Sequence, residues 1–186
     1  LLKNQYKISL KSFYQINPIQ VGVLYQTAID LAHLNQDSVV LDAYCGIGTI
    51  SLSLAKHVKK VYGVEVVPQA IEDAKNNALL NKIDNVDFVC DDAGKYMVEL
   101  VKKNTHLDVV FVDPPRKGCS QVFLDQLVTL SPDKIIYVSC DVATQARDIA
   151  YLQEHNYQVD ICQPVDMFPQ THNIENIIRL SKKTLI

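Results

Sequence analysis

The stretch Leu41-Asp42-Ala43-Tyr44-Cys45-Gly46-Ile47-Gly48-Thr49 decides the fold, because it joins a short apolar run to a helix-like segment. The run Val39–Leu41 is β-branched and apolar, which is typical of a strand covered by helices on both faces. Glycines at positions 46 and 48 let the backbone turn tightly and approach a ligand closely. The stretch therefore predicts a strand, a glycine loop and a helix within a parallel α/β sheet.

Segments of the same two kinds alternate along the chain with short connections. Four more apolar runs predict strands, at Val61–Val64, Val86–Val89, Val109–Val112 and Ile135–Val138. Helical patterns lie between the strands, at residues 49–57, 68–81, 93–103, 120–130 and 142–155. This alternation predicts an α/β fold with a doubly wound, mostly parallel sheet.

The helix predicted over residues 68–81 has the clearest pattern. Pro68 stands in its first turn, where proline is favoured. Ile71, Ala74, Ala78 and Leu79 follow the helical period and form an apolar face. We therefore expect these side chains to pack against the sheet.

The two ends of the chain depart from the alternation. Two strand candidates, Tyr157–Cys162 and Ile174–Ser181, follow each other without a helical pattern between them, which predicts an antiparallel hairpin at the edge of the sheet. Residues 1–36 form a lead-in segment with a helix over Ile19–Leu34, and we expect it to pack on a domain formed by residues 37–186. The chain starts without methionine, which indicates a fragment of a longer protein.

Composition limits the class of protein. A length of 186 residues, 48% of them hydrophobic and 21% charged, is typical of one soluble globular domain. No apolar stretch approaches the roughly 20 residues that span a bilayer, and no secretory signal is recognisable, so we expect a cytoplasmic protein without a membrane partner. Five cysteines without a Cys-x-x-Cys pair argue against a disulfide framework and a structural zinc site. The net charge of −3 opposes nucleic-acid binding unless basic residues gather locally.

The glycine loop favours one class of cofactor. A dinucleotide-binding loop usually has Gly or Ala at position 51, where this chain has Ser51, and Asp42 would repel a pyrophosphate. Asp42 can instead receive a cationic group, directly or through water, which favours S-adenosylmethionine over NAD. Glu65 ends the second strand, where an acidic residue accepts hydrogen bonds from ribose hydroxyls of either cofactor. Asp91 and Asp92 follow the third strand, where they either read an adenine amino group or cap the next helix.

Two more strand ends bring reactive groups to the same edge of the sheet. The fourth strand ends in Val112–Gly118 (VDPPRKG), where two prolines stiffen the loop that presents Asp113. Arg116 and Lys117 in this loop offer phosphate contacts. The fifth strand runs into Cys140, and a thiol at that edge can add covalently to a ring or carbonyl. Free cysteines are more often ordinary core residues, so the thiol alone leaves both interpretations open.

Taken together, five segments resemble, in order, the motifs of the RNA uracil-5-methyltransferase family. They are Ser12–Pro18 (SFYQINP), Leu41–Gly48 (LDAYCGIG), Val112–Gly118 (VDPPRKG), Tyr137–Asp141 (YVSCD) and Asp166–Glu175 (DMFPQTHNIE). Enzymes of this family use S-adenosylmethionine to make 5-methyluridine in tRNA or ribosomal RNA. The resemblance covers nearly the whole chain and implies the catalytic domain of the family, with a Rossmann-like class I methyltransferase fold.

The resemblance implies roles for individual residues. It makes Cys140 the nucleophile that adds to carbon 6 of uracil, and Glu175 the base that removes the proton from carbon 5. His172 is expected to be structural or to contact RNA. The residues that the resemblance assigns to the cofactor or its pocket are Gln15, Tyr44, Glu65, Asp92 and Asp113.

The resemblance also implies the reaction and the partners. We expect S-adenosylmethionine-dependent methylation of carbon 5 of a uridine in RNA, through a covalent cysteine–uracil adduct, with 23S ribosomal RNA favoured over tRNA. We expect no metal and a monomer. We also expect the full-length protein to carry an N-terminal RNA-binding domain, as many members of the family do.

Two departures and two alternatives accompany this resemblance. Asp141 and Val142 follow Cys140 where Asn-Pro is frequent, and Asn176 follows Glu175 where a smaller residue is common. An RNA cytosine-5-methyltransferase would use related covalent chemistry, but such enzymes usually have a cysteine beside the prolines of the fourth strand. An RNA-binding module with a relict cofactor pocket would not need the thiol or the base.

The four remaining cysteines are expected to play no part in the chemistry. Cys45, inside the glycine loop, should pack against the cofactor, and Cys119 should lie near the cleft. Cys90 and Cys162 are expected to be bystanders.

Overall fold

The computed structural model describes residues 1–9, 17–171 and 173–183, so Gln15 and His172 lie outside the described residues. The elements alternate as the sequence predicts, and most boundaries lie close to the predicted ones. In chain order they are α1 (Pro18–Ala32), β1 (Val39–Ala43), α2 (Thr49–Leu54), the 3-10 helix η1 (Ala55–His57), β2 (Lys60–Glu65), α3 (Pro68–Leu80), β3 (Val86–Cys90), α4 (Ala93–Lys102), β4 (Val109–Val112), α5 (Gln121–Leu130), β5 (Lys134–Ser139), α6 (Val142–Glu154), β6 (Tyr157–Val165) and β7 (Glu175–Lys182).

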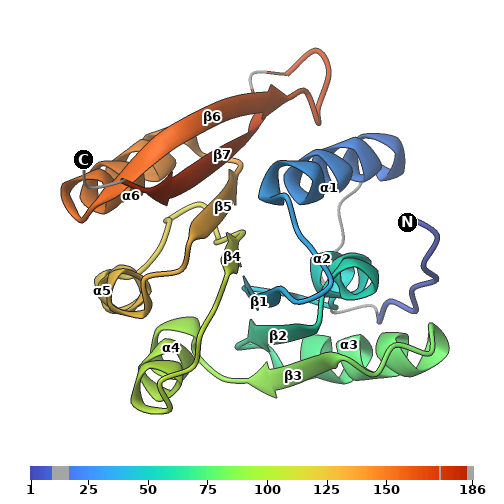
Figure 1. The fold of residues 1–186 in the computed structure, drawn as a ribbon. Coiled ribbons are helices and arrows are strands. Elements are labelled where there is room, and N and C mark those ends of the chain that lie inside the picture. The colour runs from blue at the N-terminus through green and yellow to red at the C-terminus, as the bar shows by residue number, and fades with distance from the viewer. Residues whose placement is uncertain (10–16, 172, 184–186) are drawn as a thin grey trace.

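The strands form one sheet in the order β3-β2-β1-β4-β5-β7-β6 (Figure 1). Strands β1 to β5 run parallel, whereas β7 is antiparallel to both of its neighbours, β5 and β6. This confirms the predicted α/β fold with a mostly parallel sheet and an antiparallel hairpin at its edge. The second strand of the hairpin, β7, is the one that joins the parallel part of the sheet.

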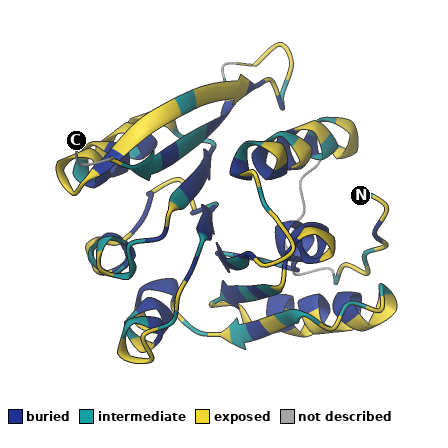
Figure 2. Cartoon of the chain, in the orientation of Figure 1, coloured by how far each residue is buried: buried dark blue, intermediate teal, exposed yellow. Residues whose placement is uncertain are grey.

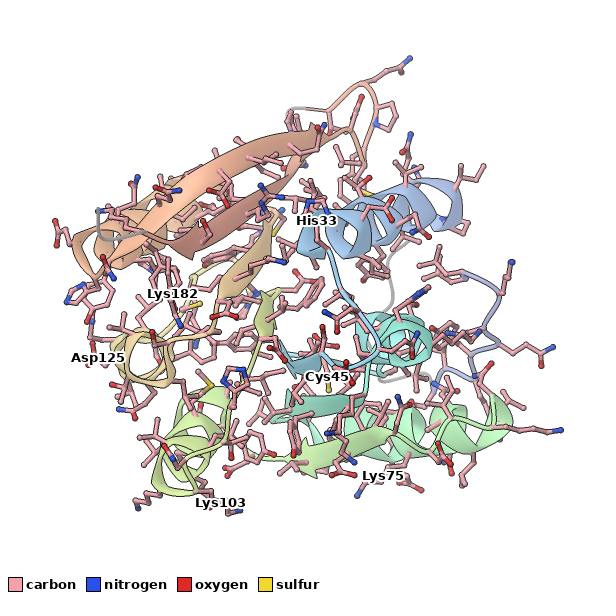
Figure 3. The ribbon with its side chains drawn as sticks, in the orientation of Figure 1. His33, Cys45, Lys75, Lys103, Asp125 and Lys182 are labelled. Carbon is pink, nitrogen blue, oxygen red and sulfur yellow. The ribbon has the colours of Figure 1, made fainter. Side chains whose placement is uncertain are left out.

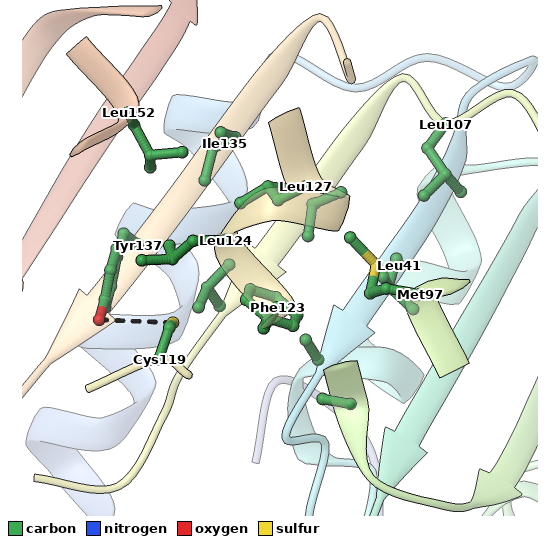
Figure 4. Packing of buried hydrophobic residues seen from close by; sticks show 14 of the residues in the cluster. Leu41, Met97, Leu107, Cys119, Phe123, Leu124, Leu127, Ile135, Tyr137 and Leu152 are labelled. Carbon is green, nitrogen blue, oxygen red and sulfur yellow. Dashed lines mark hydrogen bonds between the residues drawn. The ribbon is translucent and has the colours of Figure 1, made fainter. Parts of the chain in front are cut away.

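Helices cover both faces of the sheet, α1 to α3 on one face and α4 to α6 on the other (Figure 1). Consecutive residues of a strand point to opposite faces, so Val40 packs under α1 and α2 while Leu41 packs under α4 and α5. The buried sides of the helices all face the sheet (Figure 2), and the cluster around Leu41 and Phe123 fills the space beneath α4 and α5 (Figure 4). Burial on both faces explains why the strands are continuously apolar.

The predicted apolar face of α3 is wrong at one position. Ile71, Ala74 and Ala78 are buried, but Leu79 is 76% exposed. The buried side of α3 is turned toward Asn77, which is fully buried because its side chain pairs with the backbone of Lys7 in the N-terminal segment. A neighbouring segment that offers backbone partners thus makes a polar residue, and not Leu79, part of the buried face.

Among the described residues, none of the helices combines the length and the apolar character that crossing a bilayer requires.

The carboxyl ends of β1 to β5 meet at one edge of the sheet. Between β1 and β4 the chain changes direction of winding, and open α/β sheets bind ligands at such a point.

Candidate active site

A cavity of about 780 Å³ lies at this edge, between the loops that follow the parallel strands. Side chains from α1, from α2 and from β7 complete its lining. Six of the seven residues that the sequence assigns to the site line this cavity, and the seventh, Gln15, lies outside the described residues. The six are Tyr44, Glu65, Asp92, Asp113, Cys140 and Glu175.

The glycine loop after β1 has the two properties that its sequence predicts. Gly48 has φ +82°, and a Cβ there would lie 2.7 Å from the ring of Phe88, so the loop packs too closely for a side chain. Gly46 has φ +53°, and a Cβ there would meet no atom within 4 Å, because this glycine faces the open cavity. The loop therefore leaves bare backbone exposed to a ligand.

Glu65 at the end of β2 is held by this loop. One carboxylate oxygen accepts the backbone N–H of Gly46 at 3.2 Å, and the other accepts the N–H of Val67 at 3.0 Å. A carboxylate oxygen can accept more than one hydrogen bond, so both oxygens retain acceptor capacity toward the cavity. Two backbone donors thus fix this carboxylate at the wall of the cavity.

Asp92 caps the next helix, as one of the two alternatives predicts, and it also lies on the wall of the cavity. Its side chain caps α4 by accepting the backbone N–H of Lys95 at 3.1 Å, and it also lines the cavity beside Asp91. Capping fixes the orientation of the carboxylate without using all its acceptor positions.

Asp42 is not placed for the direct contact with a ligand that the sequence left open beside a contact through water. Its side chain is fully buried, does not line the cavity, and accepts a hydrogen bond from Ser51. Its other oxygen has no hydrogen-bond partner among the described residues. Burial raises the pKa of Asp42 to about 7, although the bond from Ser51 opposes the rise. Ser51 therefore replaces the expected small residue because it is the partner of this buried carboxyl group.

Cys140 and Glu175 are neighbours across two strands. The antiparallel pairing of β5 with β7 ends with Ser139 opposite Asn176, so the next position of this register sets Cys140 opposite Glu175. Glu175 is only 4% exposed, and both residues line the cavity. Asn176, the departure from the family pattern, braces this point, because its buried side chain donates to Gln145 at 2.7 Å.

The charges at this end of the cavity act on one another. Burial raises the pKa of Glu175, and the guanidinium of Arg116 opposes the rise. Burial and the nearby Glu175 raise the pKa of the Cys140 thiol, whereas the charge of Arg116 and a hydrogen bond from it lower that pKa. Burial, Glu175 and Asp42 raise the pKa of Asp113 to about 8, and no described residue donates a hydrogen bond to its carboxyl group. Arg116, expected only to contact phosphate, therefore also stabilises the thiolate form of Cys140.

The loop after the thiol accommodates its departures from the family pattern. Asp141 caps α6 by accepting the backbone N–H of Thr144 at 2.9 Å, so this helix begins without a proline. The hydroxyl of Thr144 donates to the carbonyl oxygen of Arg116 at 2.9 Å. The loop that carries Arg116 is thereby tied to the start of the helix that follows Cys140.

Sequence reasoning missed two aromatic residues of the cavity. Tyr25 of α1 is buried and lines the cavity, and burial together with the nearby Asp113 carboxylate raises the pKa of its hydroxyl. Phe168, from the segment between β6 and β7, lines the same cavity. Asn17, the cap of α1, donates to the carbonyl oxygen of Met167 at 3.0 Å and holds these two segments together. A tyrosine on the buried side of a helix gave no signal beyond ordinary packing.

The other cysteines are free and are placed close to the expectations. Cys45, labelled in Figure 3 beside the carboxyl end of β1, is buried and lines the cavity. Cys119 is buried outside this cavity, 3.6 Å from the hydroxyl of Tyr137 (Figure 4), and burial raises the pKa of its thiol to about 12. Cys90 and Cys162 are exposed. In the part of the chain that the structure describes, no cluster of His, Cys, Asp and Glu side chains is arranged to hold a metal ion.

Comparison with known proteins identifies the family. Residues 2–183 match the family model described as tRNA (Uracil-5-)-methyltransferase. An uncharacterized RNA methyltransferase of Clostridium tetani is 51% identical over 177 residues, which cover 95% of this chain and 38% of that protein. An uncharacterized RNA methyltransferase of Streptococcus mutans is 50% identical over 182 residues, or 98% of this chain and 40% of that protein. The chain thus spans about two fifths of the length of these relatives.

A solved structure agrees with these matches. The Pyrococcus abyssi tRNA (uracil-54, C5)-methyltransferase, in complex with S-adenosyl-L-homocysteine, superposes with a TM-score of 0.82 and 33% identity, over 94% of this chain and 41% of that one. The family that the five sequence segments predict is therefore confirmed. The chain belongs to the tRNA (uracil-5-)-methyltransferase family.

Proposed function

We propose that this chain is the catalytic domain of an enzyme that methylates carbon 5 of a uridine in RNA, through a covalent bond between Cys140 and the base. The observation that carries the proposal is the register of β5 with β7, which sets a thiol and a carboxylate side by side in the cavity. A pyrimidine ring offers carbon 6 for thiolate addition and carbon 5 for proton removal, so it needs these two groups on adjacent positions.

The residues at the other end of the cavity fit S-adenosylmethionine. Gly46 leaves an open space that a Cβ would enter, and Glu65 is fixed with acceptor positions free for a ribose diol. Tyr44, Glu65 and Asp92 would hold the cofactor there, with Gln15 as a further expected contact. When bound, the cofactor supplies a methyl group that is activated as a sulfonium.

The chain's own residues provide the remaining steps. The thiolate of Cys140 adds to carbon 6 of the uracil, and the electrons of the ring double bond make carbon 5 nucleophilic. After carbon 5 has gained the methyl group, Glu175 takes the proton that remains on this carbon. The double bond re-forms, the bond between sulfur and carbon 6 breaks, and Cys140 leaves as a thiolate. The target base must leave its stack to enter this cavity.

Asp113, which the resemblance assigns to the cofactor or its pocket, is also suited to recognise the target uracil. Its carboxyl group lies near Glu175 without a described hydrogen-bond partner, so it is available to pair with the polar edge of a pyrimidine. The cysteines near the β4 loop argue against the cytosine-5 alternative, which requires a reactive cysteine beside Pro114 and Pro115. Cys119 is the cysteine nearest these prolines in sequence. It is buried outside this cavity, and burial raises the pKa of its thiol to about 12.

The test is covalent trapping with the full-length protein. RNA transcribed with 5-fluorouridine should form a stable adduct, because fluorine replaces the proton that Glu175 must remove. Cys140→Ala should form no adduct and transfer no methyl group, while its affinity for S-adenosylhomocysteine stays within about twofold. Methyl transfer by the alanine variant would overturn the proposal and favour a non-covalent mechanism. An adduct through a different cysteine would overturn the assignment of the thiol.

The RNA itself is assigned by a second measurement. Mass spectrometry of tRNA and of 23S ribosomal RNA from cells lacking the gene should reveal one missing 5-methyluridine. The sequence expectation favours 23S ribosomal RNA, whereas the printed names of the family model and of the P. abyssi structure favour tRNA. An RNA-binding domain outside this chain is part of the same proposal, since the relatives are more than twice as long.

A further inference from the structure

A second, smaller cavity of about 390 Å³ lies next to the active site, on the other side of the loop after β4. Lys117 lines both cavities. The side chains that face the second cavity are mostly polar, and two of them, Lys117 and Arg147, are basic. We call it the Lys117–Arg147 groove.

Arg147 is held in one orientation at this groove. Its Nε and Nη2 groups donate to the same oxygen of Asp148 at 2.9 and 2.7 Å, and Nη2 also donates to the carbonyl oxygen of Lys117 at 3.0 Å. No described group accepts a hydrogen bond from Nη1, and the side chain is 57% exposed. One edge of the guanidinium is thus fixed by the protein, while the other presents two N–H donors to solvent.

The carboxylate of Asp148, which holds Arg147, is itself fixed in the core. Asp148 is fully buried, and its second oxygen accepts the hydroxyl of Tyr137 at 2.7 Å and the backbone N–H of Cys119 at 2.8 Å. Gly118 has φ +74°, and a Cβ there would lie 2.6 Å from both the Arg147 Nη2 group and Asp148. The backbone at Gly118 therefore lies too close to the ion pair for a side chain to fit there. Because Asp148 offsets the charge of Arg147, Lys117 supplies the net positive charge of the groove.

The charges around the two cavities divide along the sheet. The β2 and β3 end of the active-site cavity is lined by acidic residues, which suits a cationic cofactor: Glu65, Asp91 and Asp92. Among the described residues that line this cavity, Arg116 and Lys117 are the basic ones, and both belong to the β4 loop beside Cys140. Asp113 and Glu175 line this end too, but they are buried or half-buried, whereas Arg116 and Lys117 are exposed. The exposed rim of the β4 loop, continued by the groove, is therefore where the overall negative chain offers positive charge to a polyanion.

From this arrangement we propose that the Lys117–Arg147 groove binds a phosphate of the RNA strand next to the target uridine. This inference rests on the proposed function, since it takes the flipped base to enter beside Cys140. A base in the active site leaves its flanking phosphates at the mouth of the cavity, which the groove adjoins through Lys117. The fixed guanidinium edge donates to phosphate oxygens, and the lysine adds charge.

The test measures RNA binding separately from methyl transfer, with the full-length protein and two labelled unmodified transcripts, one a tRNA and one a fragment of 23S ribosomal RNA. Lys117→Ala should weaken binding of the preferred transcript, and the slope of log K against log salt should decrease in magnitude by about 0.7, the value for one phosphate of a single strand. Lys117→Glu should weaken binding further. The KM for S-adenosylmethionine should not change in either variant.

Matched variants separate a phosphate contact from other effects. Lys75→Ala removes another exposed lysine, from α3 on the opposite face of the sheet (Figure 3), and should leave the slope unchanged. Arg147→Gln leaves Asp148 with fewer partners, so its melting temperature is measured beside its RNA affinity, and Arg147→Lys keeps the charge but loses the fixed fork. Both should weaken RNA binding, the glutamine variant more.

Two results would overturn the proposal. The first is an unchanged salt slope in Lys117→Ala. The second is unchanged RNA affinity in Lys117→Glu together with faster proteolysis between domains, which would mean that the groove docks another part of the protein. Failure of the proposed function is distinguishable, because an enzyme that modifies no uridine could still bind RNA with a slope that depends on Lys117.

Discussion

Cys140 lies opposite Glu175 because the register of β5 with β7 pairs Ser139 with Asn176. The thiol follows its strand directly, and the carboxylate begins the next one in the sheet, so neither depends on a long loop for its position. Strand positions hold reacting groups more rigidly than loops do. The hairpin that ends the fold thus places Glu175, the proposed general base, beside Cys140, the proposed nucleophile.

Glu175→Gln should impair release of the adduct more than its formation. The amide keeps the shape of the side chain but cannot take the proton from carbon 5, so turnover should fall by about 10²- to 10⁴-fold. A protein–RNA species that already carries the methyl group should accumulate with ordinary uridine. A denaturing gel with radiolabelled methyl donor measures it, and Glu154→Gln, an exposed change on α6, is the control. Normal turnover without a retarded band would mean that another group is the base.

Arg116→Gln should move the pH profile of methyl transfer to higher pH. Arg116 lowers the pKa of Cys140 and of Glu175, so its loss raises both and leaves less of each group deprotonated at neutral pH. Activity should fall at pH 7 and recover in part as pH rises. Alkylation of Cys140 by iodoacetamide, followed by peptide mass spectrometry, should show the same shift. A higher KM for RNA at every pH, without a shift, would limit Arg116 to phosphate binding.

The sequence predicts the elements well because their signals are local. The strand runs, the proline at the start of α3 and the glycines after β1 each act on their immediate neighbours, and the structure has each of them where it was expected. The apolar face of α3 was wrong at Leu79 because the N-terminal segment, distant in sequence, pairs with Asn77.

The candidate site was predictable only in part for the same reason. Motifs at strand ends identified the residues that line the cavity, since parallel strands bring their carboxyl ends together. The position of β7 between β5 and β6 depends on pairing between distant segments, and it decides which residues face Cys140. The position of Tyr25 at the cavity and the burial of Asp42 likewise depend on packing that no local pattern indicates.

Glu65→Ala should weaken binding of S-adenosylhomocysteine by about 1.5–3 kcal/mol, as expected when a charged partner of hydrogen bonds is lost. Glu65→Gln should lose a large part of the same affinity, because its NH₂ group cannot accept the backbone N–H of Gly46 or Val67. Calorimetry measures both, with the exposed Glu72→Ala as the control. An unchanged dissociation constant would remove Glu65 from the cofactor pocket.

Asp42→Asn should change how stability depends on pH. The pKa of Asp42 is raised to about 7 in the folded protein and is about 3.9 when unfolded, so the folded state binds more protons between these values. The wild type should therefore lose stability relative to the asparagine variant as pH rises from about 4 to about 7, and the difference should level off above that. Calorimetric melting temperatures without cofactor test this, and Asp37→Asn, an exposed change, is the control. Parallel curves for wild type and Asp42→Asn would contradict a buried carboxyl group with a raised pKa.

Tyr25→Phe should show that α1 contributes to the active site. The substitution keeps the ring in the core but removes the hydroxyl that lies near Asp113 in the cavity, so kcat should fall by up to about tenfold while cofactor affinity stays unchanged. Tyr157→Phe is the matched control, because it loses a buried hydrogen bond to Pro132 far from the cavity. Each change should cost about 1 kcal/mol of stability. If only Tyr25→Phe slows methyl transfer, the hydroxyl of Tyr25 positions groups in the cavity. If both variants retain full activity after equal losses of stability, Tyr25 only packs α1 against the sheet.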